Sequence, residues 1–218
     1  MTWSPTKLRD FFTHFDPKNP NHLAAIDELQ KDAPQLMNDD ADWVKKYRTP
    51  VSAPSPSGDS SASIATHIIK DFEGFVPCPY LCPAGVWTIG YGTTYYSNGQ
   101  LVQPGDPCIT EKTGAEYLEY YITHNIIPVL AKKIPTWNQM NSNQQAAIIS
   151  FAYNLGTHFY GSSGFSTITR ALSSIANWGD VPAALMLYVN PGSSFEEGLK
   201  RRRKAEGELW QGKGPYAG

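Results

Sequence analysis

The stretch Glu73–Thr94, EGFVPCPYLCPAGVWTIGYGTT, brings a carboxylate, a thiol and several hydroxyls together with aromatic residues. Apolar residues at helical spacing from Ile64 onward predict a helix that ends near Glu73, because Gly74 is a natural cap. Aromatic neighbours exclude water from a carboxylic acid and so favour its protonated form. Such an acid can protonate a leaving group, for example a glycosidic oxygen. From residue types alone two interpretations stay open: Glu73 is a general acid, or it only ends a helix and faces solvent.

The residues after Glu73 predict a small antiparallel β element. β-Branched and aromatic residues run from Val86 to Thr94, and Asn98-Gly99 offers hairpin-turn chemistry. Helix signals dominate the rest: a segment capped by Thr110 that ends near Asn125, a capping box of Ser142 and Gln145 before a helix closed by Gly156, and helices over Ser166–Ile175, Val181–Val189 and Glu196–Trp210. We therefore expect an α+β, helix-dominated domain with a small sheet near its start.

A Pro/Ser-rich segment divides the chain. Residues 49–63, TPVSAPSPSGDSSAS, have the composition of a solvated linker, so we place the domain boundary there. Residues 1–48 show three short helical patterns punctuated by prolines and predict a small helical module. A block this short is marginal for independent folding, so it is either a targeting or assembly module or an arm docked on the main domain, residues 64–218.

Charge and cysteine content exclude several function classes. A net charge of -2 gives no global reason to expect nucleic acid as a partner. Charges near the N-terminus and the lack of a long apolar run predict no membrane insertion. Three cysteines, Cys78, Cys82 and Cys108, are too few for a disulfide framework, and any two of them can pair. The five histidines show no metal-ligand spacing, so we predict neither a metal nor another cofactor.

The same stretch resembles the catalytic region of the phage-type lysozymes, the family of the lambdoid-type endolysins. The family pattern is Glu, eight residues, a polar catalytic residue, five residues, Thr, and it falls here on Glu73, Cys82 and Thr88. Further family-like strings are NQQAAIISFAYNLG and GLKRRRKAE, so the resemblance extends over roughly Ile64–Gln211. It implies a lysozyme-like domain in which Glu73 protonates the leaving oxygen and Thr88 holds the attacking water.

Cys82 departs from the commoner family pattern, which has Asp at this position, although some members carry Cys. A thiolate there can act as base or electrostatic partner for the water, whereas a neutral thiol does much less. The base role requires a lowered thiol pKa, since an ordinary cysteine is mostly protonated at neutral pH. The alternative is a small, inert, buried cysteine. Oxidation with Cys78 or Cys108 would silence Cys82, and reduction would restore it.

The resemblance also implies substrate-binding residues. Tyr153 and Asn154 match positions that approach the sugar, although Tyr153 also fits a buried stripe. An arginine of the last helix pairs with the acid in the family, and Arg202 is our choice among Arg201, Arg202 and Arg203. Most of the charge run Lys200–Lys204 is expected to be solvated surface.

These features together predict a lysozyme that cleaves the β-1,4 bond between N-acetylmuramic acid and N-acetylglucosamine. The alternatives are a lytic transglycosylase and a non-catalytic wall-binding virion protein. The expected partner is bacterial peptidoglycan, with a holin for release or a phage structural protein as further partners, and the expected state is a monomer. We expect residence in the host cytoplasm before release and action in the periplasm or cell wall, or association with the virion.

Overall fold

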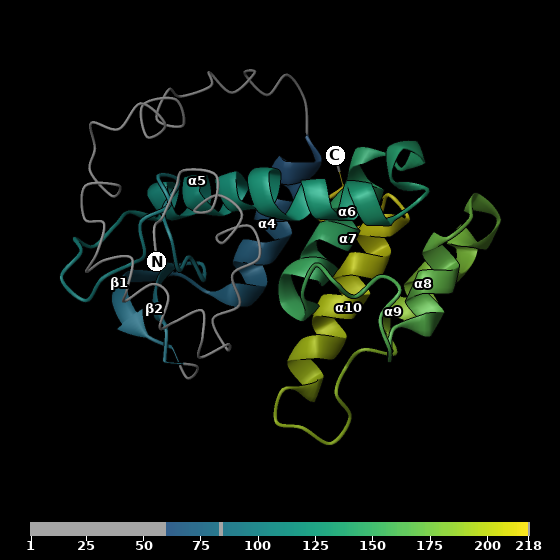
Figure 1. Ribbon diagram of the computed structural model, residues 1–218. Helices are drawn as coiled ribbons and strands as arrows, with labels where there is room; N and C mark the ends of the chain where they lie inside the picture. Colours follow the sequence, from purple (N-terminus) through teal and green to yellow (C-terminus); the bar gives the residue numbers. More distant parts are fainter. Residues whose placement is uncertain (1–59, 83–84, 218) are drawn as a thin grey trace, which may run out of the picture. The chain divides into compact units, whose positions relative to one another are not determined.

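The computed structural model describes residues 60–82 and 85–217, so the predicted module at 1–48 and residues 49–59 of the predicted linker lie outside the described residues. The end of the predicted linker is wrong, because the first described helix already begins at Ser61. The described part is helix-dominated and contains a two-stranded antiparallel sheet, which confirms the predicted α+β class (Figure 1). Its α-helices and strands are α4 (Ser61–Glu73), β1 (Val76–Leu81), β2 (Trp87–Gly90), α5 (Glu111–Tyr121), α6 (Ile127–Lys133), α7 (Ser142–Leu155), α8 (Ser166–Leu172), α9 (Val181–Leu185) and α10 (Glu196–Trp210).

Helix α4 carries Glu73 as its last residue, as the sequence predicts. The Ser60 side chain caps its start, and the apolar face that includes Ile64 and Ile68 is buried. Gly74 follows with φ 72°, a left-handed conformation that a residue with a Cβ adopts only at a cost. The chain therefore leaves the helix immediately after Glu73 and enters β1.

Strands β1 and β2 pair antiparallel, with Tyr80 opposite Thr88. Pro77 and Pro79 have no backbone N–H and so cannot donate hydrogen bonds from β1. This is tolerated because both strands of a two-stranded sheet are edge strands. In Figure 1 the sheet lies on one side of α4, while α8 and α9 lie on the far side of α10. Thr88 lies in β2, and Cys82 follows the end of β1.

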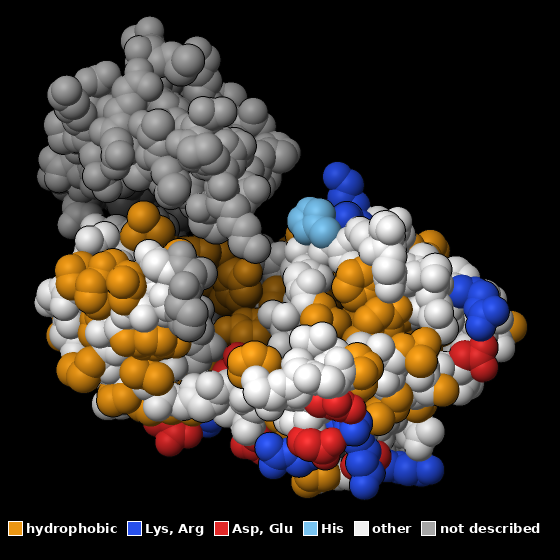
Figure 2. Space-filling model, turned by 90° about the horizontal axis from the view of Figure 1, so that it is seen from below, with side chains coloured by type: hydrophobic (Ala, Val, Ile, Leu, Met, Phe, Trp, Pro, Cys, Tyr) orange, Lys and Arg blue, Asp and Glu red, His pale blue; other side chains and the backbone are white. Residues whose placement is uncertain are grey.

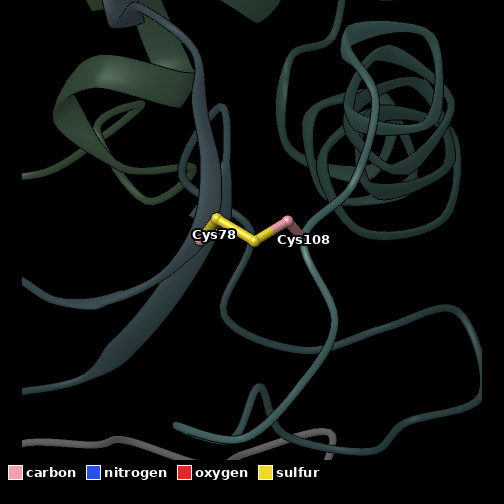
Figure 3. Close-up of a disulfide and its surroundings, with 2 residues drawn as sticks. All are labelled: Cys78 and Cys108. Carbon is pink, nitrogen blue, oxygen red and sulfur yellow. A yellow bond between two sulfur atoms is a disulfide. The ribbon is translucent and has the colours of Figure 1, made fainter.

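A disulfide joins Cys78 of β1 to Cys108, which precedes α5, with a Cα–Cα distance of 4.1 Å (Figure 3). Beside it, the Ile109 amide donates to the Pro77 carbonyl at 2.8 Å. Cys82 lies outside this disulfide. The sequence left the pair open, and the expectation that oxidation captures Cys82 is wrong for this arrangement, because Cys78 and Cys108 are already bonded to each other.

The core lies where α4, α7 and α10 pack together. Helix α7 contributes a run of fully buried residues that includes Ile149 and Phe151, and α10 contributes Leu209. This packing sets the end of α4 and the middle of α10 beside α7, and the charged residues of the site come from there.

The helix boundaries differ from the prediction in three places. The segment capped by Thr110 does not end near Asn125 but continues to Lys133, because a π-helical turn over Ile122–Ile126 brings Pro128 into the first turn of α6, where its missing N–H costs little. The capping box is Asn141 with Gln144, one residue earlier than predicted. The two helices predicted over Ser166–Ile175 and Val181–Val189 are shorter, and a 3-10 turn over Ile175–Asp180 connects them.

Candidate active site

Glu73 contacts Arg202 across the junction of α4 and α10. The Arg202 Nη1 lies 2.6 Å from the Glu73 Oε1. The Arg202 side chain is only 4% exposed, whereas that of Glu73 keeps 28% of its surface. Of the three adjacent arginines, Arg202 is the one in contact with Glu73, because Arg201 is exposed and Arg203 is buried against Glu206. The acid is thus held by a buried cation yet remains open to solvent.

A buried polar cluster lies behind Arg202. Its Nε donates to the Glu206 Oε1 at 3.3 Å and its Nη2 donates to the Ser150 carbonyl at 3.1 Å. The Ser150 hydroxyl donates to the same Glu206 oxygen at 2.7 Å, and the Arg203 Nη1 donates to the Glu206 Oε2 at 2.5 Å. Burial raises the pKa of the Glu206 carboxyl, and the charges of Arg203 and Arg202 oppose that shift. Together with the contact from Nη1 to Glu73, these bonds give every guanidinium nitrogen of Arg202 a protein acceptor.

Sequence reasoning missed Glu206 and Ser150. A signal for Glu206 was present, since it follows Arg203 by three residues and Arg202 by four, and such residues share one face of a helix. For Ser150 no comparable signal exists, because its partner lies 56 residues away.

Cys82 and Thr88 meet at the carbonyl of Val86. The Cys82 backbone amide and the Thr88 hydroxyl both donate to this carbonyl at 3.0 Å. Thr88 is buried, and Cys82 is partly exposed. Opposite Thr88, burial raises the pKa of the Tyr80 hydroxyl, and the negative charges of Cys82 and Glu73 raise it further. Tyr80 thus lies within electrostatic reach of both Cys82 and Glu73.

Tyr153 and Asn154 lie at the end of α7, and their polar groups contact the protein. The Tyr153 hydroxyl donates to the Tyr91 carbonyl at 2.6 Å, and a Cβ on Gly92 would lie 2.8 Å from that hydroxyl, so only glycine leaves room for it. Burial raises the pKa of Tyr153, and the charge of Glu73 adds to this shift, which places Tyr153 near the acid. The Asn154 Oδ1 accepts from the Arg203 Nη2.

The remaining charged residues form no single-sign patch on the face shown in Figure 2, where basic and acidic side chains lie beside one another. Lys200, for example, pairs with Glu196 and Glu197. Within residues 60–82 and 85–217, no group of three or more His, Cys, Asp and Glu residues is placed to hold a metal ion. None of the helices in this described part has the length and apolar character needed to cross a membrane.

The chain matches the phage lysozyme family model over residues 70–206. It is 29% identical over 153 residues to an endolysin of Acyrthosiphon pisum secondary endosymbiont phage 1, covering 66% of this chain and 92% of that protein. It is 27% identical over 161 residues to a SAR-endolysin of Haemophilus phage HP1, covering 68% of this chain and 79% of the relative.

Solved structures show the same fold. A mutant of the phage P22 lysozyme is 25% identical with a TM-score of 0.56, and the match covers 67% of this chain and 94% of that one. The active form of the phage P1 endolysin is 24% identical with a TM-score of 0.53, covering 77% and 92%. This chain therefore belongs to the phage lysozyme family, as a peptidoglycan-cleaving glycoside hydrolase of the endolysin type that acts on the host cell wall in lysis.

Proposed function

We propose that the chain hydrolyses the β-1,4 bond between N-acetylmuramic acid and N-acetylglucosamine with Glu73 as the general acid. The observation that carries this assignment is the contact of a partly exposed Glu73 with a buried Arg202 at 2.6 Å. Arg202 engages Oε1, which leaves Oε2 to carry the proton. When the glycosidic bond breaks, that proton passes to the leaving oxygen of the sugar.

Cys82 and Thr88 handle the attacking water in this proposal. The Thr88 hydroxyl donates a hydrogen bond to the Val86 carbonyl, so the Thr88 oxygen can still accept a hydrogen bond from water. The water oxygen bonds to the anomeric carbon, and its proton passes to Cys82 acting as a thiolate. The product is then inverted at the anomeric carbon, as expected when acid and base flank the bond with a water between them.

Arg202, Tyr153 and Asn154 have different roles in this assignment. Arg202 positions Glu73 rather than binding sugar, since all of its guanidinium nitrogens have protein acceptors. Tyr153 and Asn154 contribute a ring and an amide at the sugar, because an aromatic face and an amide suit sugar rings and their hydroxyls. Their contacts with Tyr91 and Arg203 hold both side chains in place.

Lytic transglycosylation is the second candidate, and one observation favours it: Cys82 stands where a second carboxylate would activate water. Mass spectrometry of the products from purified peptidoglycan separates the two reactions. Hydrolysis gives reducing muramic ends, whereas transglycosylation gives anhydro-muramic ends and consumes no water. Products with anhydro ends alone would overturn the hydrolytic assignment. The activity itself is measured as the fall in turbidity of a suspension of permeabilised Gram-negative cells.

We propose further that the chain works as a monomer and reaches the wall from the host cytoplasm with the help of a holin. The supporting observation is the mixture of acidic and basic side chains on the face shown in Figure 2. Fractionation of expressing cells tests the route. The chain should stay with the soluble fraction until the membrane is permeabilised, and sedimentation with intact membranes would contradict this.

A further inference from the structure

Two arginines and two carboxylates meet at the junction of α4 and α10. The side chains of Arg203 and Glu206 have no exposed surface, that of Arg202 is 4% exposed and that of Glu73 is 28% exposed. A guanidinium does not lose its proton in a protein, and a buried charge needs a partner of opposite charge. The two buried cations are therefore balanced by Glu206 from inside and by Glu73 from the solvent side.

This balance changes when Glu73 works as an acid. A general acid must be protonated before it reacts, and protonation removes the negative charge that faces Arg202. Glu206 is then the one carboxylate still in contact with Arg202 among the described residues, through the 3.3 Å bond from Nε. The hydroxyl of Ser150 and the guanidinium of Arg203 hold both oxygens of Glu206 in place.

We propose that Glu206 is a positioning residue for Glu73. It aims Arg202 so that Nη1 meets the acid, and it supplies the standing negative charge that lets Glu73 carry a proton beside a buried guanidinium. This inference rests on the proposed role of Glu73 as general acid, and it assigns a reason for a fully buried carboxylate that the reaction itself does not use.

The charges around both carboxylates set the expected pH effect. Glu73 contacts Arg202 of α10, and its charge acts on Tyr80 of β1 and Tyr153 of α7. The charge of Cys82 acts on Tyr80 as well. Glu206 faces Arg202 and Arg203 of its own helix and Ser150 of α7. The cations in these two sets are the arginines, so removing the charge of Glu206 leaves them to favour ionised Glu73. Activity then needs a lower pH.

The test is Glu206→Gln in the full chain, assayed as the release of reducing ends from purified peptidoglycan between about pH 4 and 9. We expect kcat to fall about tenfold because the amide cannot accept from both arginines, while KM stays within about twofold. The alkaline limb of the profile should move about one pH unit toward acid. The matched control is Glu208→Gln on the same helix. Glu208 pairs with Lys204 and is more exposed than Glu206, so this change should alter neither kcat nor the alkaline limb.

Glu206→Asp separates charge from position and also serves if the glutamine variant does not fold. It keeps the charge but shortens the side chain by one methylene, so kcat should fall while the alkaline limb stays in place. Wild-type kcat in folded Glu206→Asp, or a wild-type limb in folded Glu206→Gln, would overturn the inference. Glu73→Gln is measured beside them. If Glu73→Gln is inactive, either of these two results overturns only the positioning role of Glu206. If Glu73→Gln is active, the proposed role of Glu73 as general acid is wrong.

Discussion

The acid side of the proposed site, around Glu73, and its water side, around Cys82 and Thr88, are held in different ways. Glu73 ends the 13-residue helix α4 and is backed by Arg202 and Glu206, which are buried between long helices. Cys82 and Thr88 belong to a two-stranded sheet and its loop, where both bond to the carbonyl of Val86. The acid is therefore positioned by charged contacts distant in sequence, and the water-handling groups by a short local backbone arrangement.

This difference has consequences for stability as well as for catalysis. The helical side shares the main core, so it draws on the burial of residues such as Ile149 and Phe151. Strand β1 buries little of its own, with Leu81 56% exposed, and it is tied to the segment before α5 by Cys78–Cys108. Small elements without enough core commonly depend on such crosslinks. Substitutions should therefore act mainly on catalysis around Glu73 and on local stability around the disulfide.

The largest effect is expected from Glu73→Gln. The amide is nearly isosteric and still accepts from Arg202, but it has no acidic proton for the leaving oxygen. Lysis should fall by about a hundredfold to ten-thousandfold, with thermal unfolding close to wild type. The measurement is the initial rate of clearing of permeabilised Gram-negative cells. Glu116→Gln on α5 is the control, since its exposed pair with Lys112 spans 4.0 Å and should matter little.

Substitutions of Cys82 should have the next largest effect and test the water side directly. Cys82→Ala leaves no group that can accept a proton from water, so we expect a loss of about a hundredfold in clearing rate. Cys82→Asp should preserve lysis, because a carboxylate at this position can also accept the proton from water. Full activity of a folded alanine variant would mean that Cys82 only packs, and the assignment of a base would then be withdrawn.

The two sides also differ in how far the sequence predicts them. Local signals located the end of α4 at Glu73 and Gly74, the strand β2 and the bounds of α10, because caps and hydrophobic periodicity act over a few residues. They missed β1: the Asn98-Gly99 turn leads only to the isolated bridge Tyr95–Leu101, and β2 pairs instead with the segment before it. The same short stretch of sequence also indicated Cys82 and Thr88 as candidate site residues, since the two lie six residues apart. The sequence thus predicted one of the two strands of the sheet side, but not the strand with which it pairs.

The charged residues that hold Glu73 were harder to predict from the sequence. That Arg202 contacts Glu73, 129 residues away, followed from family resemblance and not from any local pattern. Glu206 was passed over because a charge run such as KRRRK usually marks a solvated helix face. Here tertiary packing buries Arg202 and Arg203 together, and burial is a property of the whole fold. The disulfide pair was likewise beyond reach, because three cysteines allow three pairings.

Removal of the disulfide should weaken the sheet side without the catalytic loss expected for Cys82→Ala. In the double variant Cys78→Ser, Cys108→Ser, the crosslink between residues 30 apart is lost, and we expect the free energy of unfolding to fall by about 4 kcal/mol. Urea unfolding measures the change. Cys82→Ala is the control, since it keeps the disulfide. An increase of lysis on reduction of the wild type would contradict this account and revive the idea that oxidation silences Cys82.

The smallest effect is expected from Tyr91→Phe, at the point where the two sides touch. The Tyr91 hydroxyl donates to the Glu111 Oε1 at 2.8 Å, and Lys70 of α4 lies 3.1 Å from the same oxygen. Loss of this hydrogen bond should lower the free energy of unfolding by about 1 kcal/mol at neutral pH. The Tyr91 carbonyl, which accepts from Tyr153, is unchanged by the substitution, so lysis should stay near wild type.

The alkaline stability of the same variant gives the sharper readout. Burial and the hydrogen bond to Glu111 raise the pKa of Tyr91 from 10.0 to about 12. The folded state thus binds this proton more tightly than the unfolded state, so the stabilisation is present below pH 10 and is lost as pH rises toward 12. Tyr91→Phe should flatten this part of the stability decline in urea unfolding. Tyr120→Phe, which removes an exposed bond to the Ser97 carbonyl, is the control and should change stability by less than about 0.5 kcal/mol. An unchanged alkaline slope in Tyr91→Phe would show that this link between the sheet and the helices does not depend on the Tyr91 proton.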